Sequence, residues 1–160
     1  MATITQKLGR KQERELALRG IFQIPFHKTQ EDMDNSIEFF LEEMNSTSNI
    51  ESESPIIGET TGYAGHLISV VVQYCQEIDS LIEPYLKKDW KLERIPNAEK
   101  AILRLCIAEM LYLEIPKEIA INEAVELAKL YGDDDSQSYI NGILNNFAQE
   151  HLSSTDGQIS

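Results

Sequence analysis

The chain has 160 residues, of which 42% are hydrophobic and 26% charged, with a formal net charge of −13. This length fits one domain with a buried core, and the hydrophobic fraction excludes a disordered chain. The apolar runs are too short for a transmembrane helix, and the N-terminus lacks the apolar segment of a secretory signal. Cys75 and Cys106 lie far apart in apolar segments, which predicts buried thiols in a reducing cytoplasm.

The charge is distributed unevenly along the chain. Residues 1–28 contain six basic and two acidic side chains, a net charge of +4, whereas the other 132 residues carry −17. A basic N-terminal arm on an acidic body can bind phosphate locally while the body repels it elsewhere.

Helical periodicity dominates the first half, and no segment alternates like a strand. The first helix is expected from about residue 6 to Phe22 or just beyond, before Pro25, and a second over about 29–44. Residues 45–60 are rich in Ser, Asn, Thr and Glu, which predicts a mobile loop.

Two further helices are expected before residue 90. A long apolar one covers about residues 61–77, and a shorter one covers about 79–87, where Pro84 interrupts it near the middle. The next helix starts at Pro96-Asn97, with Asn97 as its N-cap and Glu99 in its first turn. Its buried stripe is expected to consist of Ile102, Leu103, Cys106 and Met110.

The last two helices follow Pro116. One begins near Ala120 and ends at Tyr131-Gly132, where the glycine would adopt the left-handed conformation; its expected buried residues are Ile121, Ala124, Val125 and Ala128. The other begins at Asp135 or Ser136 and is expected to bury Tyr139, Ile140, Ile143, Leu144 and Phe147.

Gly142 interrupts this last helix at a cost of about 1 kcal/mol. Close packing of another backbone or helix is the favoured reason, with a ligand contact as the alternative. The sequence therefore predicts an all-α fold, a compact bundle of about seven helices. One domain would span residues 1–151, with a flexible tail over 152–160.

The first helix combines a cationic and an apolar stretch on one face. At 100° per residue Lys7, Arg10, Lys11 and Arg14 share a face that Ala17, Leu18, Ile21 and Phe22 continue. This pattern predicts that the first turns project past the core and bind an anion, of which RNA is the commonest for such a segment. A solvated basic end without function remains the alternative.

Three segments carry a resemblance to a known family. They are RIPNAEKAILRL (94–105), PKEIAINEAVELAK (116–129) and YGDDDSQSYINGIL (131–144). In order and spacing they resemble the NusB family of transcription antitermination factors, above all in INEAVELAK and YINGIL. The similarity is most specific over residues 90–147 and extends to RKQERELALRGIF (10–22), which is similar to the family's arginine-rich helix start.

The resemblance implies an all-α fold of two small helical subdomains. It also implies binding of the boxA element of ribosomal RNA transcripts, together with the small-subunit ribosomal protein NusE. The partners would thus be boxA RNA, NusE and the RNA polymerase antitermination complex, and no membrane.

The resemblance also implies roles for individual residues. Arg10, Lys11 and Arg14 match arginine positions of the family's basic motif, whereas Gln12 stands where another arginine is typical and Glu13 and Glu15 add opposing charge. The expected RNA-binding residues are Lys7, Arg10, Lys11, Arg14, Phe22 and Asp135, and the expected partner-binding residues are Glu93 and Glu99. For these residues, packing, helix capping or solvation remains the alternative.

The sequence predicts no enzyme, with no catalytic residue, metal site or cofactor. Phosphate-binding glycine loops, zinc-protease motifs and serine-hydrolase motifs are absent, and the three histidines are scattered. Two hypotheses remain, namely the RNA-binding antitermination factor and a helical protein-interaction module with weakened RNA binding. The second includes a homodimer.

Overall fold

The structure is a computed structural model that describes residues 7–22, 31, 35, 62–87 and 92–152. Within these residues there are six α-helices, two short 3-10 helices and no strand, which confirms the all-α prediction. The expected loop over 45–60 and the tail beyond Leu152 lie outside the described residues. So does the expected helix over 29–44, except for Glu31 and Asn35, which are helical. None of the described helices is long and apolar enough to cross a membrane.

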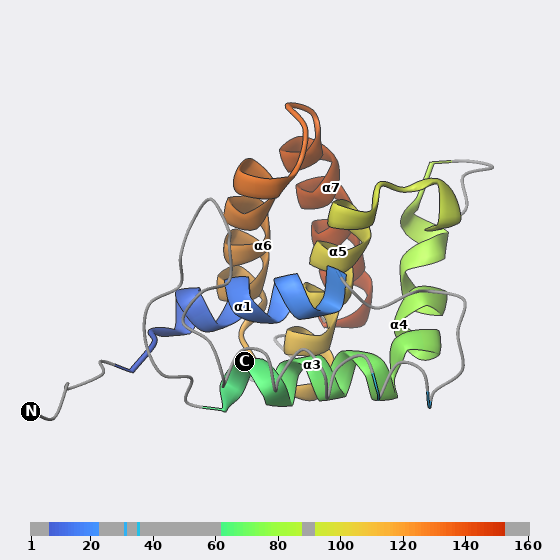
Figure 1. Ribbon diagram of the computed structural model, residues 1–160. Helices are drawn as coiled ribbons and strands as arrows, with labels where there is room; N and C mark the ends of the chain where they lie inside the picture. Colours follow the sequence, from blue (N-terminus) through green and yellow to red (C-terminus); the bar gives the residue numbers. More distant parts are fainter. Residues whose placement is uncertain (1–6, 23–30, 32–34, 36–61, 88–91, 153–160) are drawn as a thin grey trace, which may run out of the picture. The chain divides into compact units, whose positions relative to one another are not determined.

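The chain divides into two compact units, Met1–Gln73 and Tyr74–Ser160, in agreement with two helical subdomains. In the first unit α1 (Arg10–Phe22) packs along α3 (Tyr63–Gln73), as Figure 1 shows. The helices form where predicted because their small and aliphatic residues recur at helical spacing. The buried apolar side chains of this pair include Leu16, Ala17, Ile21, Ala64, Leu67, Ile68 and Val71.

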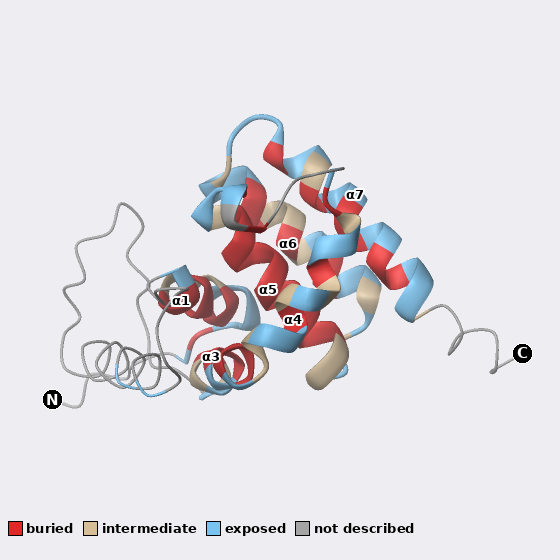
Figure 2. Ribbon diagram, turned by 90° about the vertical axis from the view of Figure 1, so that its right-hand side faces the viewer, coloured by how far each residue is buried: buried red, intermediate tan, exposed pale blue. Residues whose placement is uncertain are grey.

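The second unit is built around one central helix, α5. Figure 2 shows this helix buried along nearly its whole length, with twelve consecutive buried residues over 99–110. It packs against α4, α6 and α7, and α6 packs along α7. The elements of this unit are α4 (Cys75–Ile82), η1 (Glu83–Tyr85), η2 (Leu92–Arg94), α5 (Asn97–Tyr112), α6 (Lys117–Tyr131) and α7 (Ser136–His151).

Several predicted boundaries need correction. The apolar helix ends at Gln73 because Tyr74 forms a turn, and Pro84 lies in the 3-10 turn η1 after α4 has ended. Asn97 is the first residue of α5 and not its N-cap, which is Pro96. α6 starts three residues before Ala120, directly after Pro116. In both cases proline has an extended ψ and presets the entry to the helix.

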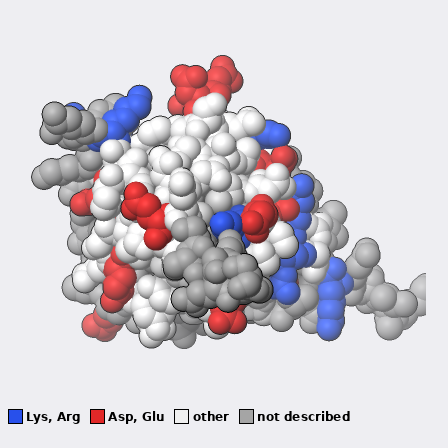
Figure 3. Space-filling model, turned by 180° about the vertical axis from the view of Figure 1, so that it is seen from behind, with Lys and Arg blue, Asp and Glu red and all other residues white. Residues whose placement is uncertain are grey.

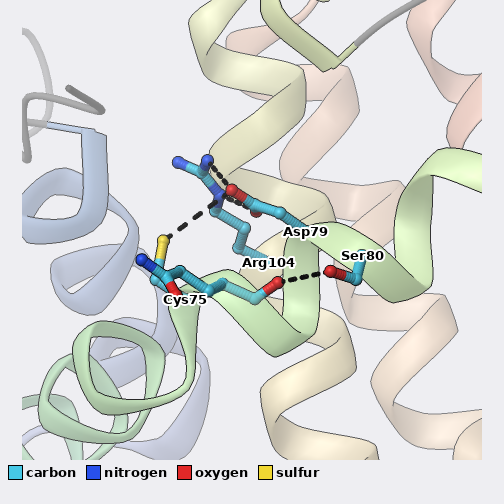
Figure 4. Close-up of polar contacts among 5 residues, drawn as sticks. Cys75, Asp79, Ser80 and Arg104 are labelled. Carbon is cyan, nitrogen blue, oxygen red and sulfur yellow. Dashed lines mark hydrogen bonds and ion pairs between the residues drawn. The ribbon is translucent and has the colours of Figure 1, made fainter.

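One buried cation fixes α4 against α5. Arg104 of α5 donates two hydrogen bonds to the carboxylate of Asp79 on α4, at 2.7 and 2.6 Å (Figure 4). The thiol of Cys75 donates to the same carboxylate at 3.9 Å, and burial is the main cause that raises the pKa of this thiol. Cys106 is buried as predicted, whereas Cys75 is only half-buried.

The two glycines of the last helices differ from expectation. Gly132 has φ −101° and ψ −179°, so it is extended and not left-handed. A Cβ there would lie 2.6 Å from the Cβ of Ser136 and 2.9 Å from the carbonyl oxygen of Ala128, which explains the glycine by close packing. Gly142 is exposed, and no atom of the described residues lies within 4 Å of the place of its Cβ, so close packing among them does not explain this glycine.

Alanine at the two glycines should therefore have opposite effects on stability. Gly132→Ala should lower the free energy of unfolding by about 1–3 kcal/mol, because the new methyl group overlaps packed atoms. Gly142→Ala should raise it by about 0.5–1 kcal/mol, because alanine favours an open helix position. Urea unfolding followed by circular dichroism measures both, and a stable Gly132→Ala variant would contradict the close contact.

Candidate nucleic-acid interface

The helix α1 begins with a backbone cap made by Gln12. The side-chain oxygen of Gln12 accepts a hydrogen bond from the Gly9 N–H at 3.0 Å, and the Gly9 carbonyl accepts the first helical bond from the Glu13 N–H. This is the return contact of a capping box, in which a Gln or Glu reaches back to the start of the helix. Lys7 therefore precedes the helix, which starts four residues later than predicted.

The predicted basic face is only partly exposed. Lys7, Arg10 and Lys11 are exposed, but Arg14 is 5% exposed and belongs to the packed face of α1. The expectation that Arg14 projects past the core is therefore wrong. At 100° per residue Arg14 lies between the directions of Ala17 and Leu18, which are both buried, so helix geometry places it on the packed side.

Two contacts connect the start of α1 to the start of α3. The guanidinium of Arg10 lies 3.7 Å from the centre of the Tyr63 ring, a cation–π contact. The buried carboxylate of Glu13 accepts a hydrogen bond from the Ala64 N–H at 3.2 Å. Since the first N–H groups of a helix have no partner within it, Glu13 acts as a cap for α3. Sequence reasoning missed both contacts because Tyr63 and Ala64 lie more than fifty positions further along the chain.

The outer face of α1 ends in an exposed aromatic ring. Phe22 is 49% exposed, although the apolar stripe had favoured a core position. Its direction on the helix lies next to those of Lys11 and Glu15, on the side away from α3. Glu15 forms an ion pair with Arg19 at 3.3 Å, so these two charges neutralise each other.

Glu99 is buried and already has a partner within the chain. It is 8% exposed and accepts a hydrogen bond from the hydroxyl of Ser136, the first residue of α7. The same hydroxyl oxygen accepts a bond from the Asp133 N–H at 2.9 Å. Glu99 therefore connects α5 to the turn before α7, and the expectation of an accessible carboxylate at this position is wrong.

The other predicted acidic residues differ in position. Glu93 lies in η2, and its side chain is outside the described set. Asp135 is exposed and directly precedes α7, where its side chain makes no capping bond. With Asp133 and Asp134 it forms an exposed acidic turn between α6 and α7. Figure 3 shows acidic side chains at the top of the view, where that turn lies in Figure 1.

Tyr139 is a further residue at this place that the sequence did not single out as a site. Its hydroxyl is buried, and none of the described residues hydrogen-bonds to it. Burial, and then the negative charge of Glu99, raise the pKa of this phenol. Its position in the apolar pattern had predicted a core residue, and no sequence signal distinguishes it from one.

The sequence matches the NusB family model over residues 11–149. The chain belongs to the NusB family. It is 37% identical over 138 residues to the transcription antitermination protein NusB of Desulforamulus reducens. The aligned region covers 86% of this chain and 87% of that protein.

Solved structures agree with this family membership. The fold is similar to that of T. maritima NusB, with a TM-score of 0.71, 32% identity and coverage of 91% of this chain and 94% of that one. A crystal structure of the antitermination factors NusB and NusE in complex with dsRNA matches with a TM-score of 0.67 and 24% identity. It covers 89% of this chain and 97% of that one, and at this identity it shows the fold alone.

The bond between Glu99 and Ser136 should contribute to the stability of this NusB-family chain. Glu99→Ala and Ser136→Ala should each lower the free energy of unfolding by about 1–3 kcal/mol, because each leaves a buried polar group without its partner. The double variant should lose less than the sum of the two. Asp134→Ala, on the exposed turn, serves as the control and should hardly change stability, and strict additivity in thermal unfolding would contradict the coupling.

Proposed function

We propose that this chain is a transcription antitermination factor that binds boxA-type RNA of ribosomal RNA transcripts together with the ribosomal protein NusE. It would act in the cytoplasm, within the RNA polymerase antitermination complex, and without catalysing a reaction. Membership in the NusB family supports this function. The observation that carries it is the group of exposed cations Lys7, Arg10 and Lys11 at the start of α1, which we call the basic arm.

The departures from the family's basic motif do not oppose this function. Gln12 caps α1, Glu13 caps α3, and Glu15 is paired with Arg19. Each of these three side chains thus has a hydrogen-bond or ion-pair partner within the first unit. The exposed charge at the start of α1 is therefore cationic, as phosphate binding requires.

Phe22 and Asp135 would contact bases, not phosphates. An exposed aromatic ring such as that of Phe22 can stack on an unpaired base of single-stranded RNA. A carboxylate repels phosphate but accepts hydrogen bonds from base amino groups, which is the contact proposed for Asp135. The buried Arg14 would support the fold of α1 and leave phosphate binding to the other cations.

The second unit suits a basic protein partner. Its described residues carry 14 acidic and six basic side chains, a net charge of −8. Complementary charge accelerates association with a cationic protein, and ribosomal proteins are usually cationic. Glu93 remains a proposed contact to this partner, while Glu99 would act by holding the turn before α7 in place.

Removal of two arm lysines should weaken RNA binding and reduce its salt dependence. Each phosphate contact contributes about −0.7 to the slope of log affinity against log salt for single-stranded RNA. Lys7→Ala/Lys11→Ala should therefore flatten the slope by about 1.4 if each lysine makes one contact. Titration of labelled boxA RNA in a salt series, with NusE present, measures the affinity and the slope.

Lys87→Ala/Lys129→Ala is the matched control, since it removes two exposed lysines from the second unit and changes the net charge equally. It should leave the slope nearly unchanged. Equal slopes for the arm variant and the wild type would overturn RNA binding by the arm and favour the protein-interaction module. Equal losses in both variants would assign the effect to net charge and would also contradict a contact by the arm.

Phe22→Ala should weaken RNA binding without weakening the fold. Loss of one stacked base costs about 1–3 kcal/mol of binding free energy. An exposed ring contributes little to stability, so the urea midpoint should stay close to that of the wild type. Phe22→Tyr keeps the aromatic face and should retain affinity. Unchanged RNA affinity in Phe22→Ala would exclude the proposed stacking.

A further inference from the structure

Two tyrosine rings stack at one end of the second unit. Tyr74 directly precedes α4, and Tyr112 is the last residue of α5. The ring centres lie 4.1 Å apart with an interplanar angle of 8°, and both side chains are half-buried. The π faces of tyrosine rings carry partial negative charge and attract cations, and both side chains are partly accessible.

Negative charge gathers beside these rings. Glu77 lies one turn after Tyr74 on α4, is exposed, and has no ion pair with any cation that the structure describes. Its charge, after burial, is a cause of the raised pKa of Tyr112, so the two side chains interact electrostatically. Both residues thus belong to one negative environment.

The end of α5 adds a further negative contribution. A helix C-terminus carries a partial negative charge, and the last turn of α5 contains no basic residue to offset it. The exposed Glu114 lies two residues after the end of α5. Arg104, a buried cation of α5, is held by Asp79 with two hydrogen bonds (Figure 4).

We propose that Tyr74, Glu77 and Tyr112 form a site for an arginine side chain of a basic protein, and we call it the cation site. The planar guanidinium would lie on a tyrosine face and donate hydrogen bonds to the Glu77 carboxylate. Both kinds of contact, arginine on a tyrosine ring and arginine with a carboxylate, occur elsewhere in the chain. Arg10 lies 3.7 Å from the ring centre of Tyr63, and Arg104 binds Asp79 with two hydrogen bonds.

A protein cation fits this site better than RNA does. A nucleobase can stack on tyrosine, but its phosphates would meet Glu77, the C-terminus of α5 and a unit with a net charge of −8. The proposal rests on the proposed function only in that a basic partner exists. Its test follows the tyrosine rings of the second unit and not the arm, so it fails or succeeds independently of RNA binding by the arm.

The test follows the tyrosine ring signals of the full chain by NMR during titration with an acetylated, amidated tri-arginine peptide at low salt. The signals of Tyr74 and Tyr112 should shift, and that of Tyr139 should not. Glu77→Gln should weaken the apparent affinity about two- to fivefold, as expected for a charge-assisted contact at an exposed site. Glu83→Gln, at the exposed end of the same segment, changes the net charge equally and should leave the affinity close to that of the wild type.

Four results would overturn the cation site. One is the absence of ring shifts at Tyr74 and Tyr112, and another is an equal loss in Glu77→Gln and Glu83→Gln, which would reflect net charge alone. The third is a stronger shift of these rings with boxA RNA than with tri-arginine, which would make the stack an RNA platform. A tri-lysine peptide should bind more weakly, because its compact ammonium groups lack the planar stacking face. Tri-lysine affinity equal to that of tri-arginine would also contradict the proposal.

Discussion

The second unit depends on α5 being buried on every side. A helix in this position must bury its polar residues as well as its apolar ones, and an unpaired buried charge is costly. Arg104 therefore requires Asp79 of α4, and Glu99 requires Ser136 of α7. These two contacts fix the neighbouring helices relative to α5 at defined points, which aliphatic packing alone does with less specificity. They also explain why Glu99 and Arg104, although charged, are buried.

The positions of the helices in this fold could be predicted from the sequence better than the contacts between them. Helical periodicity and the prolines located five of the six α-helices to within a few residues, because these signals act locally. The complete burial of α5 was not predictable, since Glu99, Lys100 and Arg104 interrupt its apolar stripe and their partners lie on other helices. Gly132 shows the same limit. Its sequence position suggested a left-handed cap, while the actual reason is contact with Ser136, four residues later.

The same limit applies to the candidate nucleic-acid interface, where contacts between helices decide which side chains are exposed. A helical wheel that begins at residue 6 counts four cations on one face, but the Gln12 cap starts α1 at Arg10, and packing on α3 buries Arg14. The wheel identified the basic character of the segment and could not identify which cations remain accessible. Phe22 is the opposite case. Its apolar type suggested the core, whereas its direction on the wheel, beside Lys11 and Glu15, is the outward one. For Phe22, the direction of the side chain relative to α3 therefore predicts exposure better than the residue type does.

The opposite charges of the basic arm and the second unit have a consequence for binding. The basic arm attracts RNA phosphate, while the acidic second unit repels it and attracts a cationic protein. A bound arginine at Glu77 would cancel part of that repulsion, so the basic partner would raise the affinity for RNA, and by linkage RNA would raise the affinity for the partner. This coupling requires no change of conformation. Because it acts through charge, it would weaken as added salt shortens the screening length, which is about 10 Å at 0.1 M. The same salt weakens each direct contact, so cooperativity and affinity should fall together.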